Sequence, residues 1–401
     1  MPVGPGLRPD HCLRPRGVLR GAALTLVFAG VLATAAATGS LPRQQTDPVK
    51  AVRAVPSRAS VDRATVDRAA LARAAAEAMA DGKSGEKAAE EFVSRSGDRW
   101  GVVYGPGEYE EFEQALDGSY TGVGLSARKA GPGRVEISRV RAGGPAARAG
   151  LRAGDRLVTL DGRPVGGLPV PEVVALLRGD GVPGTTVTLG VERDRSARTV
   201  TLSRARLATE DVTVRRLDDG TVLIKVSAFT KGTGERVRAA VRAAPAGAGV
   251  LLDLRGNPGG LVTEAAVAAS AFLDGGLVAT YDVDGEERAV YAQRGGDTER
   301  PVVALVDGGT MSAAELLTGA LKDRGRAVTV GSRTFGKGAV QMPSTLPDGS
   351  VAELTVGHYR TPAGHGVDGR GITPDLAVGD ATGERAEERA RTVLSGLGGG
   401  S

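Results

Sequence analysis

Ser312, Lys337 and Gln341 are the residues whose types and spacing could carry acyl-transfer chemistry. A serine hydroxyl becomes a nucleophile only when a neighbouring base takes its proton. Arginine cannot be that base because its guanidinium stays protonated, whereas burial lowers the pKa of a lysine amine because it disfavours the charged form. Lys337 stands beside Phe335 and Val340, which would supply apolar surroundings. Gln341 comes four residues later, one turn away if that stretch is helical.

Lysine is scarce in this chain, which makes the position of Lys337 informative. The sequence has 51 basic residues, and only 8 of them are lysines. A lysine between Gly336 and Gly338 is therefore poorly explained as a solubilising charge, and we interpret it as a general base. A structural lysine that forms a salt bridge is the alternative.

Ser312 stands at the start of a predicted helix. It follows an apolar strand expected at 302–306 and opens a helix expected at 312–322, where backbone N–H groups lack intrahelical partners. The alternative is a plain helix cap, because serine is a preferred N-cap and Glu315 would complete a capping box. The lysine that follows in the chain favours the nucleophile.

A glycine-rich turn supplies a third element. Asp253-Leu-Arg-Gly-Asn-Pro-Gly-Gly is a strand end followed by a turn that opens a helix near Leu261. The amides of Gly259 or Gly260, together with that of Ala313, could stabilise a tetrahedral oxyanion. The alternatives are a phosphate-binding turn or an ordinary turn that connects a strand to a helix. Because no Walker A lysine follows, the phosphate-binding turn is the weaker of the functional interpretations.

The elements that would position these residues form an α/β layer. After residue 206, apolar strands alternate with helices, a pattern typical of a sheet with crossover helices. Strands are expected at 222–226, 249–255, 302–306 and 327–330, and helices at 233–244, 261–273 and 312–322. Upstream, helices are expected at 61–80, with Ser60 as N-cap, at 86–94 and at 108–116.

Residues 119–205 are predicted to form a small β module around one helix at 170–178. The loop Gly122-Val123-Gly124-Leu125 would let consecutive amides point into one nest that favours an anion, although a tight turn is the alternative. With the string Ala142-Gly-Gly-Pro-Ala-Ala-Arg-Ala-Gly-Leu-Arg-Ala-Gly-Asp, this segment resembles a PDZ domain. The resemblance implies that the loop binds a peptide's terminal carboxylate and that the peptide adds as a strand.

Three motifs follow the PDZ module in order: the Asp253–Gly260 string, Met311-Ser-Ala-Ala-Glu and Thr334-Phe-Gly-Lys-Gly-Ala-Val-Gln. Together they resemble the motifs of the carboxyl-terminal processing (tail-specific) proteases, which are serine peptidases of family S41. The likeness covers about residues 60–378. It implies a crotonase-like or ClpP-like α/β spiral core with an inserted PDZ domain and an N-terminal helical arm. It also implies that Ser312 attacks, Lys337 is general base and Gln341 orients the lysine. No cofactor or metal is expected.

The same resemblance implies substrates that are proteins or peptides with free C-terminal tails. The segment 363–370 is a less typical version of the family's final loop, and Met311 is bulkier than the small residue often found there. Both departures from the family pattern bear on which substrates are bound and not on the Ser312 and Lys337 assignments. A hinge is expected between residues 116 and 120 and near residue 205.

Two other functions compete with a Ser-Lys endopeptidase. A Ser-His-Asp hydrolase would need His358 or His365, because His11 falls in the leader, and no G-x-S-x-G elbow surrounds Ser312. A catalytically silent scaffold would use the PDZ module alone to gather C-terminal tails. The presence of serine, lysine and glutamine together disfavours the scaffold.

The N-terminal segment explains the positive charge. The net charge is +4, and residues 1–38 hold four arginines against Asp10, so the remainder is nearly neutral. With only 3% aromatic residues besides, nucleic-acid binding is not expected. The uncharged run 21–42 predicts an export signal or a membrane anchor, hence an extracytoplasmic, secreted or membrane-anchored protein. Cys12 precedes the run, so the exported part has no thiol.

The expected domain boundaries follow from these patterns. They are 1–38 for a signal peptide or membrane anchor, 39–59 for a linker, 60–118 for an N-terminal helical region, 119–205 for the PDZ domain, 206–380 for the serine protease core and 381–401 for a C-terminal tail.

Overall fold

The computed structural model describes residues 66–131, 133–283, 286–379 and 384–398. These residues form two compact units. One unit consists of residues 121–207, and the other combines the described residues up to 120 with those from 208 onward. The predicted export segment 21–42 and the N-cap Ser60 lie outside the described residues. Within the described ranges, no helix is both long enough and apolar enough to cross a membrane.

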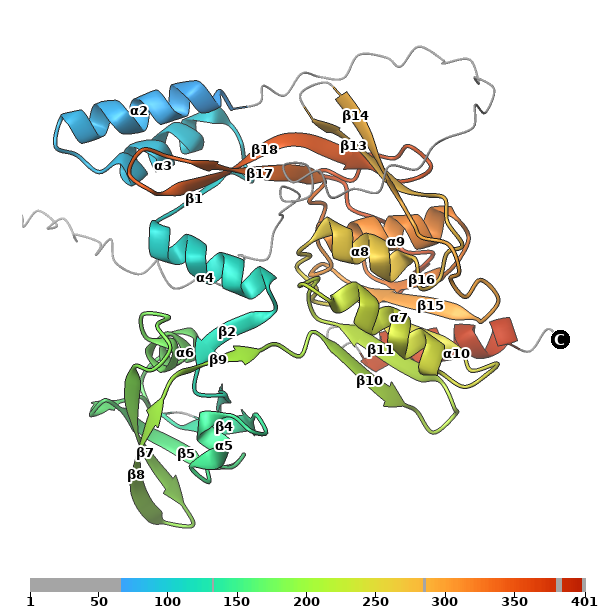
Figure 1. Ribbon diagram of the computed structural model, residues 1–401. Coiled ribbons are helices and arrows are strands. Elements are labelled where there is room, and N and C mark those ends of the chain that lie inside the picture. The colour runs from blue at the N-terminus through green and yellow to red at the C-terminus, as the bar shows by residue number, and fades with distance from the viewer. Residues whose placement is uncertain (1–65, 132, 284–285, 380–383, 399–401) are drawn as a thin grey trace, which may run out of the picture. The chain divides into compact units, whose positions relative to one another are not determined.

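A six-stranded sheet forms the centre of the larger unit (Figure 1). Its order is β10-β11-β12-β15-β16-β19, and all neighbours are parallel except β10 and β11. The central strands are runs of valine, leucine and isoleucine that are buried on both faces, as parallel strands usually are. The strands are β10 (Val212–Arg216), β11 (Val222–Val226), β12 (Val250–Asp253), β15 (Val302–Val306), β16 (Val328–Gly331) and β19 (Leu376–Ala377).

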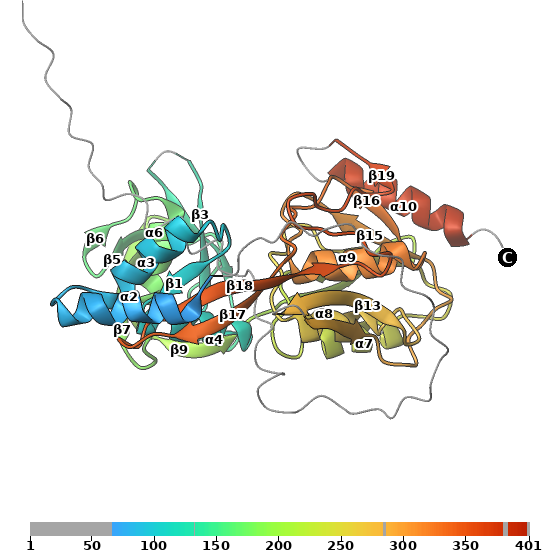
Figure 2. The same cartoon turned by 90° about the horizontal axis from the view of Figure 1, so that it is seen from above.

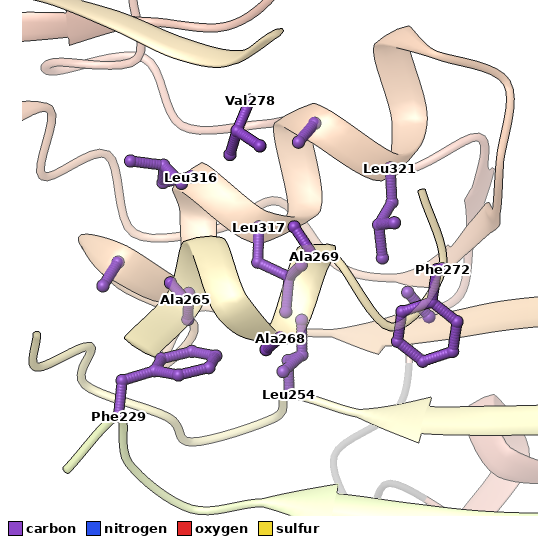
Figure 3. Close-up of a cluster of buried hydrophobic side chains, with 14 of the residues drawn as sticks. Phe229, Leu254, Ala265, Ala268, Ala269, Phe272, Val278, Leu316, Leu317 and Leu321 are labelled. Carbon is purple, nitrogen blue, oxygen red and sulfur yellow. The ribbon is translucent and has the colours of Figure 1, made fainter. Parts of the chain in front are cut away.

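Helices cover both faces of this sheet. α7 (Thr233–Ala243), α8 (Val262–Ala269) and α9 (Ala313–Asp323) pack on one face, where side chains such as Phe229, Leu254 and Phe272 form the main core (Figure 3). α10 (Glu384–Gly398) packs on the other face through Ala386, Ala390 and Leu394. The segment expected as a C-terminal tail therefore contributes a helix to the core.

The functional loops all leave the same edge of the sheet. The carboxyl ends of parallel strands meet at one edge, where α/β proteins place their sites. The turns after β11, β12, β15 and β16 occupy that edge, and they begin at residues 227, 254, 307 and 332. The predicted strand–turn–helix pattern thus gathers chain segments that are far apart in the sequence.

A second, antiparallel sheet holds the remaining segments of the larger unit. Its order is β1-β18-β13-β14, and β17 pairs with β18. Figure 2 shows the long pair β17 and β18 passing from beside α9 to α2 and α3, against which Leu346, Ala352 and Leu354 pack. The elements are β1 (Val102–Tyr104), β13 (Leu277–Val283), β14 (Glu286–Tyr291), β17 (Ala339–Thr345), β18 (Val351–Arg360), α2 (Arg68–Ala80), α3 (Gly85–Ser96) and α4 (Pro106–Leu116).

Helix α2 begins inside the range predicted for a helix at 61–80. Asp67 has an extended conformation, and its side chain accepts hydrogen bonds from the N–H groups of Ala69 and Ala70. An N-cap at Asp67 makes Arg68 the first helical residue. The predicted helix 61–80 is therefore interrupted at Asp67, and its expected start near Val61 lies outside the described residues.

The smaller unit is an antiparallel β module around its own hydrophobic core. Its sheet order is β3-β4-β5-β7-β8, with β6 paired to β5, and α6 packs against β3. Val135, Ile137, Leu157, Leu189 and neighbouring apolar residues fill its interior. The elements are β3 (Leu125–Lys129), β4 (Val135–Val140), α5 (Pro145–Arg148), β5 (Arg156–Leu160), β6 (Arg163–Pro164), α6 (Val170–Arg178), β7 (Thr186–Arg193) and β8 (Ser196–Ser203). β2 (Ser119–Gly122) and β9 (Ala205–Ala208) pair with each other.

Candidate active site

Ser312 has a strained backbone at the turn from β15 into α9. Its φ is 53° and its ψ is −117°, a combination that residues with a side chain rarely adopt. Such a conformation costs about 1–3 kcal/mol and persists only where surrounding contacts enforce it. A strained strand-to-helix turn is also how α/β-hydrolases present a nucleophilic serine. Ser312 therefore has elbow geometry although its sequence lacks the elbow pattern.

Glu315 ties the serine turn to the lysine loop. Its carboxylate accepts the backbone N–H groups of Ser312 at 3.0 Å, Gly336 at 2.7 Å and Lys337 at 2.9 Å, and the hydroxyl of Thr334 at 2.5 Å. Burial raises the pKa of the Glu315 carboxyl, and these hydrogen bonds act in the opposite direction. The sequence predicted only a capping role for Glu315, but this one side chain holds two loops together.

Lys337 and Gln341 are in direct contact. Lys337 Nζ donates to Gln341 Oε1 at 2.6 Å, and Lys337 is 2% exposed. Burial lowers the pKa of the Lys337 amine to about 7, against which the charges of Glu353, Asp98 and Asp368 act. A lysine with this pKa is substantially neutral near neutral pH and has a lone pair to accept a proton.

The contact between Lys337 and Gln341 does not come from a helical turn. Residues 333–338 form a loop, and Gln341 lies in β17 beside a register shift between Val340 and Gln341. The conditional expectation of helical spacing was therefore wrong. A bulge redirects a side chain out of the regular alternation of a strand, which is how the structure brings the amide to the amine.

Trp100 is a component of the site that sequence reasoning missed. Its carbonyl oxygen accepts from Gln341 Nε2 at 2.5 Å, which leaves Gln341 Oε1 facing the lysine. Its ring centroid lies 5.3 Å from Lys337 Nζ, and its Nε1 donates to Asp368 Oδ1 at 3.0 Å. Arg99 pairs with the same carboxylate at 2.8 Å. The segment 363–370, which the sequence marked as atypical, thus supports the lysine through Asp368.

The glycine turn lies directly against Ser312. A Cβ on Gly259, whose φ is +99°, would come within 2.9 Å of Ser312 Cβ and 3.1 Å of the Ala313 nitrogen. Only glycine fits there. The N–H of Gly259 donates to Asn257 Oδ1 at 2.8 Å. Phe229 forms a bridge to Gly260, in which the Phe229 N–H donates to the Gly259 oxygen and the Leu261 N–H donates to the Phe229 oxygen. Of the three N–H groups that the sequence predicted as oxyanion donors, that of Gly259 is therefore already engaged.

The histidines have other neighbours. His358 Nε2 lies 3.5 Å from Asp368, and His365 Nδ1 lies 3.9 Å from Asp323 with a side chain that is 75% exposed. Their described ion pairs connect them to carboxylates on the final loop and on α9, not to the serine turn.

The predicted carboxylate loop of the smaller unit lies between β2 and β3. Gly124 has a φ of +77°, and the carbonyls of Val123 and Gly124 accept from Ala146 and Arg141 at 2.9 and 2.8 Å. These bonds hold Gly122-Val123-Gly124-Leu125 at the start of β3, which packs beside α6. An edge strand beside a helix is the arrangement that accepts a peptide as an added strand.

Comparison with known proteins defines the class. Residues 220–378 match the family profile "Peptidase family S41", and residues 136–193 match "PDZ domain". The larger unit thus contains a domain of peptidase family S41 within residues 220–378, and the smaller unit contains a PDZ domain within residues 136–193, as the motifs predicted.

Within that class, individual relatives can be named. The chain is 31% identical over 313 residues to a protein of Staphylococcus haemolyticus named "Probable CtpA-like serine protease", covering 74% of this chain and 60% of that protein. It is 35% identical over 298 residues to the "C-terminal processing peptidase, chloroplastic" of Tetradesmus obliquus, covering 68% and 63%. The chain therefore spans about 60% of the length of these curated relatives.

A solved structure shares the fold. An S41 protease of Bacteroides fragilis superposes with a TM-score of 0.51 at 17% identity, covering 85% of this chain and 93% of that one. At this identity the likeness concerns the fold alone, which is mixed α/β.

Proposed function

We propose that the chain is a serine endopeptidase that cleaves protein substrates near their C-terminus through a Ser312–Lys337 dyad. The observation that carries the proposal is the state of Lys337, a buried amine whose pKa is lowered to about 7 and whose hydrogen bond to Gln341 Oε1 fixes its position. Its loop is joined to the strained serine turn through Glu315. A nucleophile with an adjacent, oriented base is the arrangement that covalent acyl transfer requires.

The reaction follows from these groups. The neutral amine of Lys337 takes the proton of the Ser312 hydroxyl as Oγ adds to the scissile carbonyl carbon. The resulting oxyanion faces the N–H groups of Ala313 and Gly260, at the positively polarised start of α9. The lysine ammonium then gives its proton to the leaving nitrogen, and the C–N bond breaks. Water then attacks the acyl ester as Lys337 takes its proton. The acyl C–Oγ bond breaks, the ammonium returns this proton to Oγ, and the carboxylic acid product leaves with the Ser312 hydroxyl and the neutral amine restored.

Gln341 orients the base in this scheme. Its amide cannot reverse without placing its oxygen against the Trp100 carbonyl, so Oε1 stays directed at Lys337. The amide oxygen accepts from the amine without adding a formal charge, and the amine can therefore remain neutral.

The PDZ domain would capture the substrate tail. The proposed contacts are the backbone amides of the Gly122–Leu125 loop with the terminal carboxylate and strand addition beside β3. The partner is a protein or peptide with a free, apolar C-terminus. The hinge segments 116–120 and near 205 would let the domain deliver the tail or gate the site.

Export is part of the proposal. An uncharged run at 21–42 behind an arginine-bearing segment supports secretion or membrane anchoring, and so places substrate cleavage outside the cytoplasm.

Tail capture is tested with one peptide in two forms. Two peptides of identical sequence with an apolar C-terminus, one a free acid and one amidated, are offered to the full chain. The free acid is expected to be cleaved with a KM roughly tenfold lower or better, because only it supplies the carboxylate to the loop. Equal KM values for the two peptides would refute tail capture. Binding of the free acid without any cleavage would support the scaffold alternative.

A further inference from the structure

Glu353 is a buried carboxyl that the proposed reaction does not use. It lies in β18, opposite Pro343 of β17 and Val102 of β1, and it is 2% exposed. Neither of its carboxylate oxygens has a hydrogen-bond partner among the described residues. Burying a carboxyl without a partner destabilises a fold, and an apolar side chain of similar size would pack at lower cost. Such a group therefore calls for a functional explanation.

Glu353 lies next to the lysine's own support. Gln341 Nε2, whose amide oxygen accepts from Lys337 Nζ, lies 3.4 Å from the backbone oxygen of Glu353. Glu353 is also the first of the charges that act on Lys337, and Lys337 is the first charge that acts on Glu353. The two buried groups are thus coupled through an interior of low polarity, where charges interact strongly.

Other ionisable groups surround this pair. Glu113 on α4 acts on Glu353, and the pKa of Tyr104 on β1 and of Tyr109 on α4 is raised first by burial and then by Glu353. The charges of Asp98 and Asp368 also act on Lys337. Lys337 is the one cation that acts appreciably on Glu353 among the described residues.

We propose that Glu353 is a positioning residue that shares a proton with Lys337 and thereby sets the pH range in which Lys337 can serve as a base. This inference rests on the proposed function, because it assigns a partner to the proposed base. It concerns the proton on Nζ and involves no contact between Glu353 and substrate.

Burial brings the proton affinities of the two groups closer together, because it disfavours the charged form of each. Burial raises the pKa of Glu353 to about 8 and lowers that of Lys337 to about 7. When the pair carries one proton, it can be a neutral amine with a carboxylic acid or an ammonium with a carboxylate. Only the first form contains a base. An ionised Glu353 therefore keeps the amine protonated, and removal of its charge frees the amine at lower pH.

The proton on Lys337 can be followed without any assay of activity. The chain has 8 lysines, so incorporation of lysine labelled with ¹³C at Cε gives a simple spectrum in which Lys337→Arg identifies the Lys337 signal. In Glu353→Gln, which keeps the size and removes the charge, the Lys337 titration is expected to move to lower pH by about one unit. The acid limb of kcat/KM should move with it, and the Tm should not fall.

A second variant leaves the core intact, and the Lys337 titration is expected to shift in the opposite direction in it. Glu113 is exposed on α4, and its charge raises the pKa of Glu353. Glu113→Gln is therefore expected to favour the Glu353 carboxylate and move the Lys337 titration to higher pH. Glu110→Gln, an exposed neighbour on the same helix, is the matched control and should leave the titration unchanged.

The outcomes are distinct. A Lys337 titration that is identical in wild type and Glu353→Gln overturns the inference, whatever the activity does. Shifts of the same sign in Glu353→Gln and Glu113→Gln also overturn it. If the titration shifts as expected while Ser312→Ala still cleaves substrate, the proton sharing stands and the proposed function fails.

Discussion

Ser312 and Lys337 donate their backbone N–H groups to the same oxygen of the Glu315 carboxylate, at 3.0 and 2.9 Å. The serine turn and the lysine loop follow different strands, so this shared acceptor fixes one against the other. Because reacting groups must be held within a fraction of an ångström, the geometry of the proposed dyad would depend on this side chain, which has no part in the proposed chemistry.

Replacement of Glu315 tests this dependence. In Glu315→Gln, an NH₂ group takes the place of one oxygen and cannot accept from the N–H donors that face it. We expect the unfolding free energy to fall by about 3 kcal/mol, because buried donors lose a charged acceptor, and kcat/KM to fall at least tenfold. Thermal unfolding and peptide cleavage measure the two effects. Glu388→Gln, an exposed residue of α10, is the control. Full activity in Glu315→Gln would show that the shared acceptor is dispensable.

The pH dependence should report the state of the lysine. Burial lowers the pKa of Lys337 to about 7, so the amine is neutral above that pH and charged below it. We expect kcat/KM to be half-maximal near pH 7 and to fall about tenfold per unit as the pH decreases further. Initial rates with one peptide between pH 5 and pH 9 would show this limb. A flat profile across the range would mean that the base is not Lys337.

Gln341 should influence that limb because its amide is a neutral acceptor for Lys337 Nζ. Gln341→Glu places a carboxylate against the amine, which favours the ammonium form, so the acid limb is expected to move to higher pH by about one unit or more. Gln341→Ala removes the acceptor from Lys337 Nζ, and kcat should fall at least about tenfold with a smaller shift. A profile in Gln341→Glu that coincides with the wild type would contradict the orienting role.

Gly259 should tolerate no side chain. Gly259→Ala would add a Cβ 2.9 Å from both Ser312 Cβ and the Met311 oxygen, at a backbone φ of +99°. The strain is about 1–3 kcal/mol, and the displaced serine should lower kcat by about a hundredfold. Gly308→Ala is the matched control, because a Cβ there would meet open space at an ordinary φ. Equal kcat values and Tm values for the two variants would refute the close approach of the glycine turn.

Much of the fold could be predicted from local patterns, and local patterns also supplied the candidates for the proposed dyad. The strands at 222–226 and 302–306 and the helix at 170–178 have the predicted bounds, because their apolar periodicity and flanking glycines act locally. Ser312 and Lys337 were identifiable from residue type, scarcity and the small residues around them.

What could not be predicted depends on contacts between distant segments. Trp100 reaches Gln341 across 241 residues through a backbone carbonyl, a group that every residue has. Glu353 resembles an ordinary strand glutamate until the pairing with β1 and β17 buries it. The bulge beside Gln341 and the strain at Ser312 are set by packing, so no pattern in the residues themselves reports them.

The most direct test of the account maps cleavage products by mass spectrometry. A protein substrate with an apolar free C-terminus is incubated with wild type, Ser312→Ala, Lys337→Ala, His358→Ala and His365→Ala. The account predicts that wild type and both histidine variants release C-terminal fragments, and that Ser312→Ala and Lys337→Ala lose about a thousandfold or more of the rate. Cleavage by Ser312→Ala at the wild-type rate, or loss of cleavage in a histidine variant with Lys337→Ala active, would contradict it.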